Sequence, residues 1–343
     1  MPPERSTALG KAAAPRRASL LLQQAWGSLQ RTGVAGQIVS LIIVIGIFAI
    51  GTRGKYFAWE NLQVILSLAA IPAILAVGLH QTIVLGGIDL SVEGVAGLCI
   101  VFVGLLVRNK YNSSDVGLWI IPIVMCAGGV AGLLSGLVLT RLRIPSFIST
   151  LGMSWILGGI AVYINRATTV PLLDLRIQSV VNGTLVGIPL IALIAIGLTV
   201  IMQLVEDHTQ FGRYIYAIGG DEQLAQQAGV NVSRIKILVF VIAGIFYGLS
   251  ALALSTRLGS AHPRTGSDTL FPAVTAVAVG GVALTGGIGG AKNAALGALI
   301  VTALNDGMIL MNVSPYVQQA VNGVVLITAV ALTLDRRKLG FIK

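Results

Sequence analysis

The sequence predicts an all-α, polytopic integral membrane protein with about ten transmembrane helices, an internal repeat and glycine-broken segments. The first observation behind this prediction is composition: 55% of the 343 residues are hydrophobic and only 10% are charged. Soluble domains usually carry about 25% charged residues. The second observation is that long apolar runs recur along the whole chain, and the third is that two of them are interrupted by glycine pairs.

Ten apolar segments are candidates for membrane-spanning helices. They are 36–51, 61–80, 91–108, 118–140, 148–164, 187–205, 235–256, 271–288, 292–311 and 316–334. Several are shorter than the roughly 20 residues that a perpendicular span needs. We therefore expect some of these helices to be tilted, broken or re-entrant.

Basic residues gather in the termini and in the short loops. Residues 1–35 form a basic tail, residues 36–334 the transmembrane domain, and residues 335–343 a second basic tail. If the N-terminus is cytoplasmic and the segments alternate, roughly two thirds of the 23 Lys and Arg lie on the cytoplasmic side. This asymmetry predicts that both termini are cytoplasmic. It also explains the net charge of +10 without a nucleic-acid partner.

The first glycine-broken segment, Gly86 to Ser91, places a carboxylate inside apolar sequence. An ionisable group at membrane depth is costly unless it is paired or faces water or protein, so Asp89 indicates a functional region. Gly87 and its neighbour let the helix break there. Asp89 could accept hydrogen bonds from backbone N–H groups, pair with a base such as Lys292, or touch a polyol. Ser91 is expected to be the N-cap of the next helix.

The longest cytoplasmic connection, residues 206–234, contains a short predicted helix. Asp221 suits the N-cap position, and the acidic Glu222 suits the first turn because of the helix dipole. Gly229 is well placed to end the helix. A helix of two turns is not stable alone, so it needs something to dock against.

Glycines and small residues define the surroundings of this short helix. Gly219 and Gly220 are expected to break the chain before it, and Leu224, Ala225 and Ala228 are expected to form a small apolar face. One interpretation is a loop helix that lies on the membrane surface. The other is a coupling helix that inserts into a cleft of another protein.

The chain contains an internal repeat. When residues 72–101 are compared with residues 272–301, ten positions are identical without a gap, among them a proline and the glycine pairs. Chance matching between two Ala-, Gly- and Val-rich helices is the alternative. Glycine-interrupted segments at matching places in two halves point to the pathway of a transporter. Asp89 is replaced by Gly289 in the second copy, so the copies are not equivalent.

A second polar group, Asn305 and Asp306, lies deep in the ninth apolar segment. It must be satisfied across helices or by water, and either lines a pathway or holds helices together. The expected substrate pathway or gate consists of Gly86, Gly87, Asp89, Ser91, Gly286, Gly287, Asn305 and Asp306. No phosphate-binding loop, metal-ligand cluster or catalytic constellation stands out in the sequence, so we expect neither an enzyme nor a metal site.

The Gly86–Ser91 segment, the loop up to Gly229 and the second glycine cluster, in that order, resemble the ribose-type permease subunits of bacterial ABC importers. The resemblance covers residues 36–340 or so. It implies a multi-pass protein of the bacterial inner membrane that moves a pentose, hexose or related polyol. It also implies three partners besides the bilayer: an ATP-binding subunit that holds ATP and Mg, an external substrate-binding protein, and a second permease copy or related chain.

By the same resemblance, a set of loop residues contacts the ATP-binding subunit. These residues are Gly220, Asp221, Glu222, Ala225, Ala228 and Gly229. Glu93 departs from the family pattern, which commonly has glycine there, and adds a second acid one helical turn from Asp89. A rival hypothesis is an ion- or proton-coupled secondary transporter that uses Asp89, Glu93 and Asp306 as coupling acids.

Overall fold

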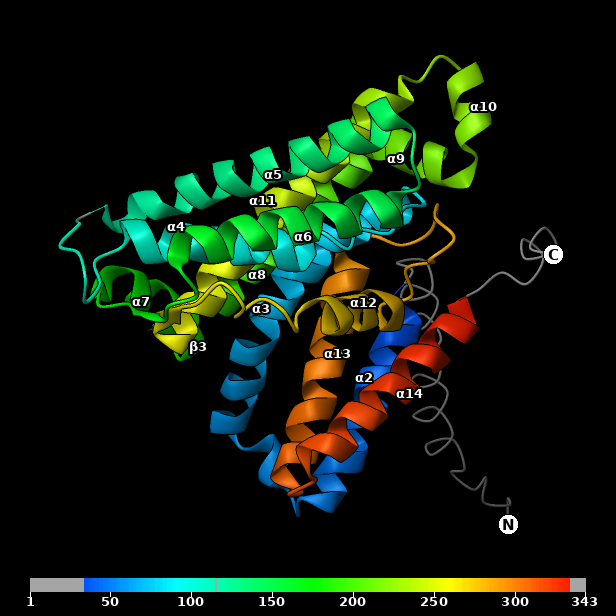
Figure 1. Ribbon diagram of the computed structural model, residues 1–343. Helices are drawn as coiled ribbons and strands as arrows, with labels where there is room; N and C mark the ends of the chain where they lie inside the picture. The colour runs from blue at the N-terminus through cyan, green and yellow to red at the C-terminus, as the bar shows by residue number, and fades with distance from the viewer. Residues whose placement is uncertain (1–33, 115, 334–343) are drawn as a thin grey trace, which may run out of the picture.

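The computed structural model describes residues 34–114 and 116–333, which are mostly helical (Figure 1). Most of both predicted tails therefore lies outside the described residues. The α-helices are α2 (Ala35–Gly51), α3 (Trp59–Val84), α4 (Val92–Leu106), α5 (Ile120–Leu142), α6 (Ser146–Asn165), α7 (Leu175–Asn182), α8 (Leu190–His208), α9 (Gln210–Gly220), α10 (Glu222–Gln227), α11 (Val232–Leu258), α12 (Leu270–Val279), α13 (Ala291–Leu310) and α14 (Pro315–Thr333).

Short elements connect these helices. They are the 3-10 helices η1 (Lys55–Phe57) and η2 (Gly117–Trp119) and the strands β1 (Val170–Pro171), β2 (Thr184–Leu185), β3 (Ile188–Pro189) and β4 (Ser260–Ala261). β1 pairs antiparallel with β4, and β2 pairs antiparallel with β3. α7 and α9 are helices that the sequence interpretation missed.

Every one of the ten predicted apolar segments overlaps a helix: α2 to α6, α8, and α11 to α14. Seven helices of the described part of the chain are long and apolar enough to cross a membrane, whereas α2, α4 and α12 are shorter. The prediction for 271–288 is wrong in its second half, because α12 ends at Val279. The chain leaves the helix there because Gly281 adopts a positive φ of 78°, which glycine favours.

The connections alternate between two ends of the molecule. At one end, β1 pairs with β4, and Asn109 forms a bridge with Leu172, so three connections meet there. At the other end, the Ser146 hydroxyl accepts a hydrogen bond of 3.1 Å from the Ile88 N–H. The chain therefore runs up and down, as expected for a bundle of spanning helices.

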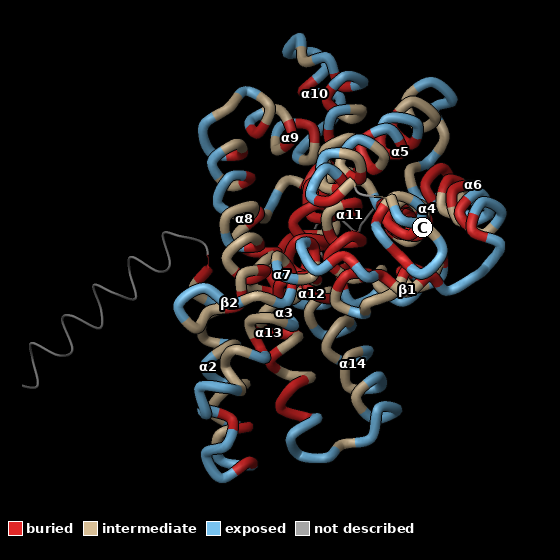
Figure 2. The backbone as a smooth tube through the Cα atoms, turned by 90° about the vertical axis from the view of Figure 1, so that its left-hand side faces the viewer, coloured by how far each residue is buried: buried red, intermediate tan, exposed pale blue. Residues whose placement is uncertain are grey.

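Two groups of helices pack around α3. One group contains α4, α5, α6 and α11, and the other contains α2, α12, α13 and α14 (Figure 1). α3 contacts α11 from the first group and α13 from the second. All residues from Ala73 to Val84 are buried, so this half of α3 is the centre of the core (Figure 2). Residues of α10 and α14 are largely exposed, and those of α2 are mostly intermediate.

Glycines let α5 and α11 approach closely. A Cβ atom placed on Gly128 would lie 2.1 Å from the Gly244 carbonyl oxygen, and one on Gly132 would lie 2.0 Å from the Phe240 carbonyl oxygen. Both substitutions would force the helices apart. Small residues that bring backbones together are typical of helix packing in membranes.

Candidate functional site

The two glycine-broken segments meet in space. We call residues 85–91, between α3 and α4, the first break, and residues 280–290, between α12 and α13, the second break. The Gly287 N–H donates a 2.8 Å hydrogen bond to the carbonyl oxygen of Val84, at the edge of the first break. A Cβ atom on Gly286 would lie 2.9 Å from the Cα atom of Gly86. The repeated glycines therefore touch one another.

The first break is organised around its own carboxylate. Asp89 is 1% exposed, and its Oδ1 accepts hydrogen bonds from the Ser91 N–H at 2.8 Å and the Ser91 hydroxyl at 2.6 Å. Its Oδ2 accepts a bond of 2.9 Å from the Tyr247 hydroxyl on α11. The sequence left three partners open for Asp89: backbone N–H groups, a base or a polyol. The structure shows the first of these, because Asp89 accepts from the Ser91 N–H.

Two neighbouring residues differ from expectation. The Ser91 side chain does not cap α4, because its hydroxyl donates to Asp89 instead. Glu93, in the first turn of α4, lies beside the backbone of Leu270 at the start of α12. Asp89 and Glu93 therefore have separate partners.

The second break is held by a carboxylate from another part of the chain. Glu206, near the end of α8, is 4% exposed, and its Oε2 accepts a 3.0 Å hydrogen bond from the Ala291 N–H at the start of α13. The Tyr216 hydroxyl on α9 lies 2.8 Å from the Gly289 carbonyl oxygen and 3.3 Å from Glu206 Oε2. Its single proton can serve one of them at a time.

His80 completes this network from α3. It is 1% exposed, and its Nδ1 lies 2.5 Å from the Val77 carbonyl oxygen. Because a carbonyl oxygen only accepts, Nδ1 must carry a proton. Nε2 lies 2.5 Å from Glu206 Oε1, so a second proton sits between His80 and Glu206. The pair joins α3 to α8 and, through Glu206, to the second break.

α9 touches both breaks through one glycine. A Cβ atom on Gly219 would lie 1.8 Å from the Val84 carbonyl oxygen and 2.6 Å from the Gly287 nitrogen. The prediction that the chain breaks at Gly219 is wrong, because α9 continues through Gly220 and the chain turns at Asp221. Gly219 permits a close backbone contact and does not end the helix.

The short helix α10 has the predicted ends. Asp221 Oδ1 accepts hydrogen bonds from the backbone N–H groups of Gln223 at 2.9 Å and Leu224 at 3.0 Å. Gly229, just beyond the helix, has a positive φ of 85°. These are the N-cap and the glycine stop that the sequence predicts.

The predicted apolar face of α10 is only partly correct. Ala225 is 5% exposed, but Leu224 is 61% exposed and Ala228 is exposed too. Glu222 forms an ion pair with Lys236 on α11, with an Nζ–Oε1 distance of 2.7 Å. α10 is thus fastened by Ala225 and Glu222 and presents Leu224 outward.

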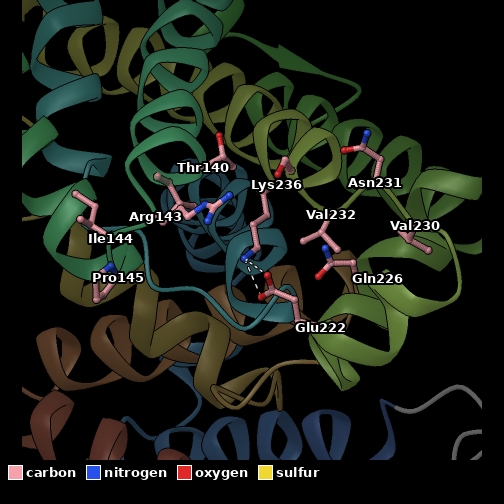
Figure 3. Close-up of a pocket in the computed structure, with 12 residues that line it drawn as sticks. Thr140, Arg143, Ile144, Pro145, Glu222, Gln226, Val230, Asn231, Val232 and Lys236 are labelled. Carbon is pink, nitrogen blue, oxygen red and sulfur yellow. Dashed lines mark hydrogen bonds and ion pairs between the residues drawn. The ribbon is translucent and has the colours of Figure 1, made fainter.

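A cleft of about 880 Å³ opens between α10 and the connection from α5 to α6. Figure 3 shows Arg143, Glu222 and Lys236 pointing into the space between these elements, with the ion pair on one side. The cleft is lined mainly by polar atoms and lies at the same end of the molecule as the two breaks. It is large enough to receive side chains of a partner.

Asn305 and Asp306 face in different directions. Asn305 lines a cavity between α12, α13 and α14 and accepts a 2.9 Å hydrogen bond from Asn322 Nδ2. Asp306 Oδ2 accepts a 3.0 Å hydrogen bond from Asn61 Nδ2 on α3. Asn305 therefore faces a cavity and α14, whereas Asp306 faces α3.

The structure brings together most of the predicted pathway residues, but not all. Both breaks and Asp89 form one cluster, and Asn305 lies in a separate cavity farther along α13. Sequence interpretation missed Glu206, Tyr216 and Tyr247 as parts of the site. One usable signal was present: Glu206 ends an apolar segment in which acidic side chains are otherwise absent. In the described part of the chain, no three His, Cys, Asp or Glu residues form a possible metal site.

Comparisons with known proteins agree with this geometry. The sequence profile of a family described as the permease component of the branched-chain amino acid transport system matches residues 61–330. The ribose import permease protein RbsC of Haemophilus influenzae is 35% identical over 297 residues, which are 85% of this chain and 90% of the relative.

Two further relatives come from Escherichia coli K12. Its ribose import permease protein RbsC is 31% identical over 305 residues, which are 88% of this chain and 93% of the relative. Its galactose/methyl galactoside import permease protein MglC is 30% identical over 315 residues, which are 87% and 93% of the two chains. No solved structure matches the chain.

Proposed function

The chain belongs to the family of membrane permease components described as the branched-chain amino acid transport system permease component, and from that premise we propose its function. We propose that it is the membrane-spanning subunit of an ATP-driven importer of a monosaccharide. The permeases from Haemophilus influenzae and Escherichia coli that it resembles are named for ribose and galactose import. Their names support a sugar as the substrate.

One observation carries the ATP-driven mechanism: the segment that ends in α10 is in direct contact with both helix breaks. Gly219 lies against Val84 and Gly287, and Asp221 starts α10 only two residues later. A push on α10 therefore reaches the two breaks through α9. The break residues Gly86, Gly87, Gly286 and Gly287 are the proposed gate.

In this proposal a partner ATPase binds ATP and Mg and docks on α10. Leu224 offers an exposed apolar anchor, and the adjacent cleft offers polar groups. The docking set is the one implied by family resemblance: Gly220, Asp221, Glu222, Ala225, Ala228 and Gly229. ATP-driven closure moves α10, and α9 passes this movement to the gate.

The opposite end of the molecule faces the outside in this proposal. It carries the β1–β4 pair and α7, which are the proposed surface for an external binding protein. The end with α10 is cytoplasmic, together with both termini, in the bacterial inner membrane. The excess of Lys and Arg at that end supports this orientation. A second copy, or a related chain, completes the pathway.

The rival function, an ion-coupled secondary transporter, requires carboxylates that share a pathway. Asp89 is enclosed by Ser91 and Tyr247, Asp306 is bonded to Asn61, and Glu93 lies beside the backbone of Leu270. Each acid thus has a protein partner of its own. These contacts, together with the exposed α10, favour the ATP-driven importer.

Docking on α10 is tested by co-purification. The full chain is co-expressed with the ATP-binding protein encoded beside it, and wild type is compared with Leu224→Arg. Leu224 is preferable to Ala225, because Ala225 is buried and its replacement would damage the packing of the permease itself. We expect wild type to retain the ATPase and Leu224→Arg to lose it.

The matched control is Leu185→Arg. Leu185 is 57% exposed, close to the 61% of Leu224, but lies in the hairpin at the opposite end. This variant should retain the ATPase. If wild type retains no ATP-binding protein, or if Leu224→Arg and Leu185→Arg behave alike, the docking proposal is wrong and secondary transport becomes the better explanation.

A further inference from the structure

A cavity of about 470 Å³ lies where α12, α13 and α14 meet, away from both breaks. We call it the amide niche. Its polar side chains come from all three helices and the segment before α12: Asp268, Thr275, Asn305, Gln319 and Asn322. Phe271 and Pro272 of α12 supply part of its apolar wall. Carboxamides and one aromatic ring around a cavity are unusual inside a membrane domain, where polar groups are costly.

The hydrogen bonding inside the niche is incomplete. Asn322 Nδ2 donates to Asn305 Oδ1 at 2.9 Å. Asn322 Oδ1 is buried and has no hydrogen-bond partner among the described residues. A buried acceptor that stays unpaired costs about 1–3 kcal/mol. Once the Asn322 amide turns toward the niche, a hydroxyl group, which donates and accepts through one oxygen, can satisfy Oδ1 and accept from a neighbouring amide.

The charges of the niche restrict the solute further. Among the described residues that line it, none is Lys, Arg or His, and Asp268 is the single acid. A zwitterionic amino acid needs a cation or several N–H donors for its carboxylate. The niche therefore fits a neutral polyhydroxylated solute. It disfavours amino acids and anions, because both carry an anionic group.

The position of the niche suits a solute on its way through the protein. Asn305 follows Ala291 by 14 residues on α13, about 21 Å along the helix axis. Ala291 is the residue whose N–H is bonded to Glu206, and α12 leads directly into the second break. Movement of the second break thus acts on two of the three helices that form the niche.

We propose that the amide niche is a transit site for a neutral polyhydroxylated solute, and that Asn305 and Asn322 contact its hydroxyl groups. The inference rests on the proposed function, because it takes the chain to be a solute permease. It goes further by assigning substrate selectivity to side chains of the membrane subunit, in addition to any external binding protein.

Uptake by the assembled transporter in proteoliposomes tests the assignment. The probes are radiolabelled ribose, its deoxy analogues, galactose and leucine, and the variants are Asn322→Leu and Asn305→Leu. We expect ATP-driven uptake of a sugar by wild type and a reduction of about tenfold in each variant, as for the loss of about 1.4 kcal/mol. We also expect a variant to discriminate less between ribose and the one deoxy analogue that lacks the contacted hydroxyl.

The matched control is Gln318→Leu, beside Gln319 on α14. Gln318 donates to the Val313 carbonyl oxygen and lies outside the niche, so uptake should remain near wild type. Retention of the ATPase on purification shows that a variant assembles. If a leucine variant does not assemble, the alanine variant at the same position is used instead. Wild-type uptake of leucine and of no sugar overturns the inference, as do amide variants with unchanged uptake and discrimination. Failure of the proposed function looks different: no ATPase is retained, or uptake does not need ATP.

Discussion

In the first break the carboxylate belongs to the break itself, whereas in the second break it comes from α8. Asp89 accepts the Ser91 N–H at the start of α4, and Glu206 accepts the Ala291 N–H at the start of α13. The corresponding helices of the two repeats thus begin on a carboxylate in both cases. An acid at the N-terminus of a helix is favourable because of the helix dipole.

This difference indicates which of the two breaks can respond to a movement of α10. The first break carries its own ligand and is tied to α11 through Tyr247, so we expect it to act as the fixed hinge of the gate, against which the second break moves. The second break depends on Glu206 and Tyr216, which lie on the segment that leads to α10. The second copy has Gly289 where the first copy has Asp89. Its carboxylate therefore comes from Glu206 on α8, outside the second break.

The largest effect is expected from Glu206→Gln. This change leaves the His80 ring and the Ala291 N–H without a buried anion, and losing one partner of a buried pair costs about 3–5 kcal/mol. We expect a strongly lowered thermal unfolding midpoint and loss of ATP-driven uptake. Asp207→Asn is the control, because Asp207 is exposed and accepts from the half-buried Gln203 side chain, whose own oxygen keeps its bond from the Lys292 N–H. If both changes lower the unfolding midpoint and uptake equally, Glu206 has no special role at the second break.

The next effect is expected from Gly219→Ala. Its new methyl group would overlap the Val84 carbonyl oxygen and the Gly287 nitrogen, and overpacking of this kind costs about 1–3 kcal/mol. ATPase activity should then become insensitive to the binding protein, because α9 no longer seats on the breaks. Gly197→Ala, in α8, is the matched control, since nothing lies within 4 Å of its Cβ position. If the ATPase activity of Gly219→Ala still responds to the binding protein, α9 does not transmit the movement of α10 to the breaks.

A smaller effect is expected from Gly289→Ala, at the position that corresponds to Asp89. Gly289 has a φ of 131°, which side chains rarely adopt, and such backbone strain costs about 1–3 kcal/mol. The unfolding midpoint should fall, and uptake with it. Ile288→Ala, at an exposed neighbour, should leave both near wild type. Full tolerance of alanine at 289 would show that the second break does not need a glycine there.

The smallest effect, and the sharpest test of the comparison, comes from two tyrosines. Tyr247→Phe removes a hydrogen bond to the first break and Tyr216→Phe removes one to the second. Each should cost about 1 kcal/mol of stability. We expect Tyr216→Phe alone to raise the ATP consumed per solute molecule transported. If Tyr247→Phe uncouples equally, the first break is not a fixed hinge.

Local sequence rules predicted much of the fold. Apolar length located ten helices, and Asp221 and Gly229 marked the ends of α10, because these signals depend on neighbouring residues only. The end of α12 was placed too late because residues 280–285 are as apolar as a helix. The sequence indicated a break at Gly286 and Gly287, whereas the chain already leaves the helix after Val279.

The site was less predictable, because its contacts join distant parts of the chain. Glu206 is 126 positions from His80 and 85 from Ala291, and a single sequence holds no sign of either contact. The repeat did indicate that the two breaks correspond, but not that they touch. The different orientations of Asn305 and Asp306 also depend on which helices surround α13, which the sequence does not specify.

The exposure of α14 has a consequence for the turnover of the protein in the cell. It lies against α12 and α13, yet none of its residues from Pro315 to Leu332 is buried, and it carries Gln319 and Asn322. A copy without a neighbour would leave this weakly apolar, largely exposed helix against acyl chains with little packing to hold it. Chaperones and proteases continuously remove chains that are not stably folded. The abundance of this chain should therefore follow the supply of its partners, so that turnover sets subunit stoichiometry.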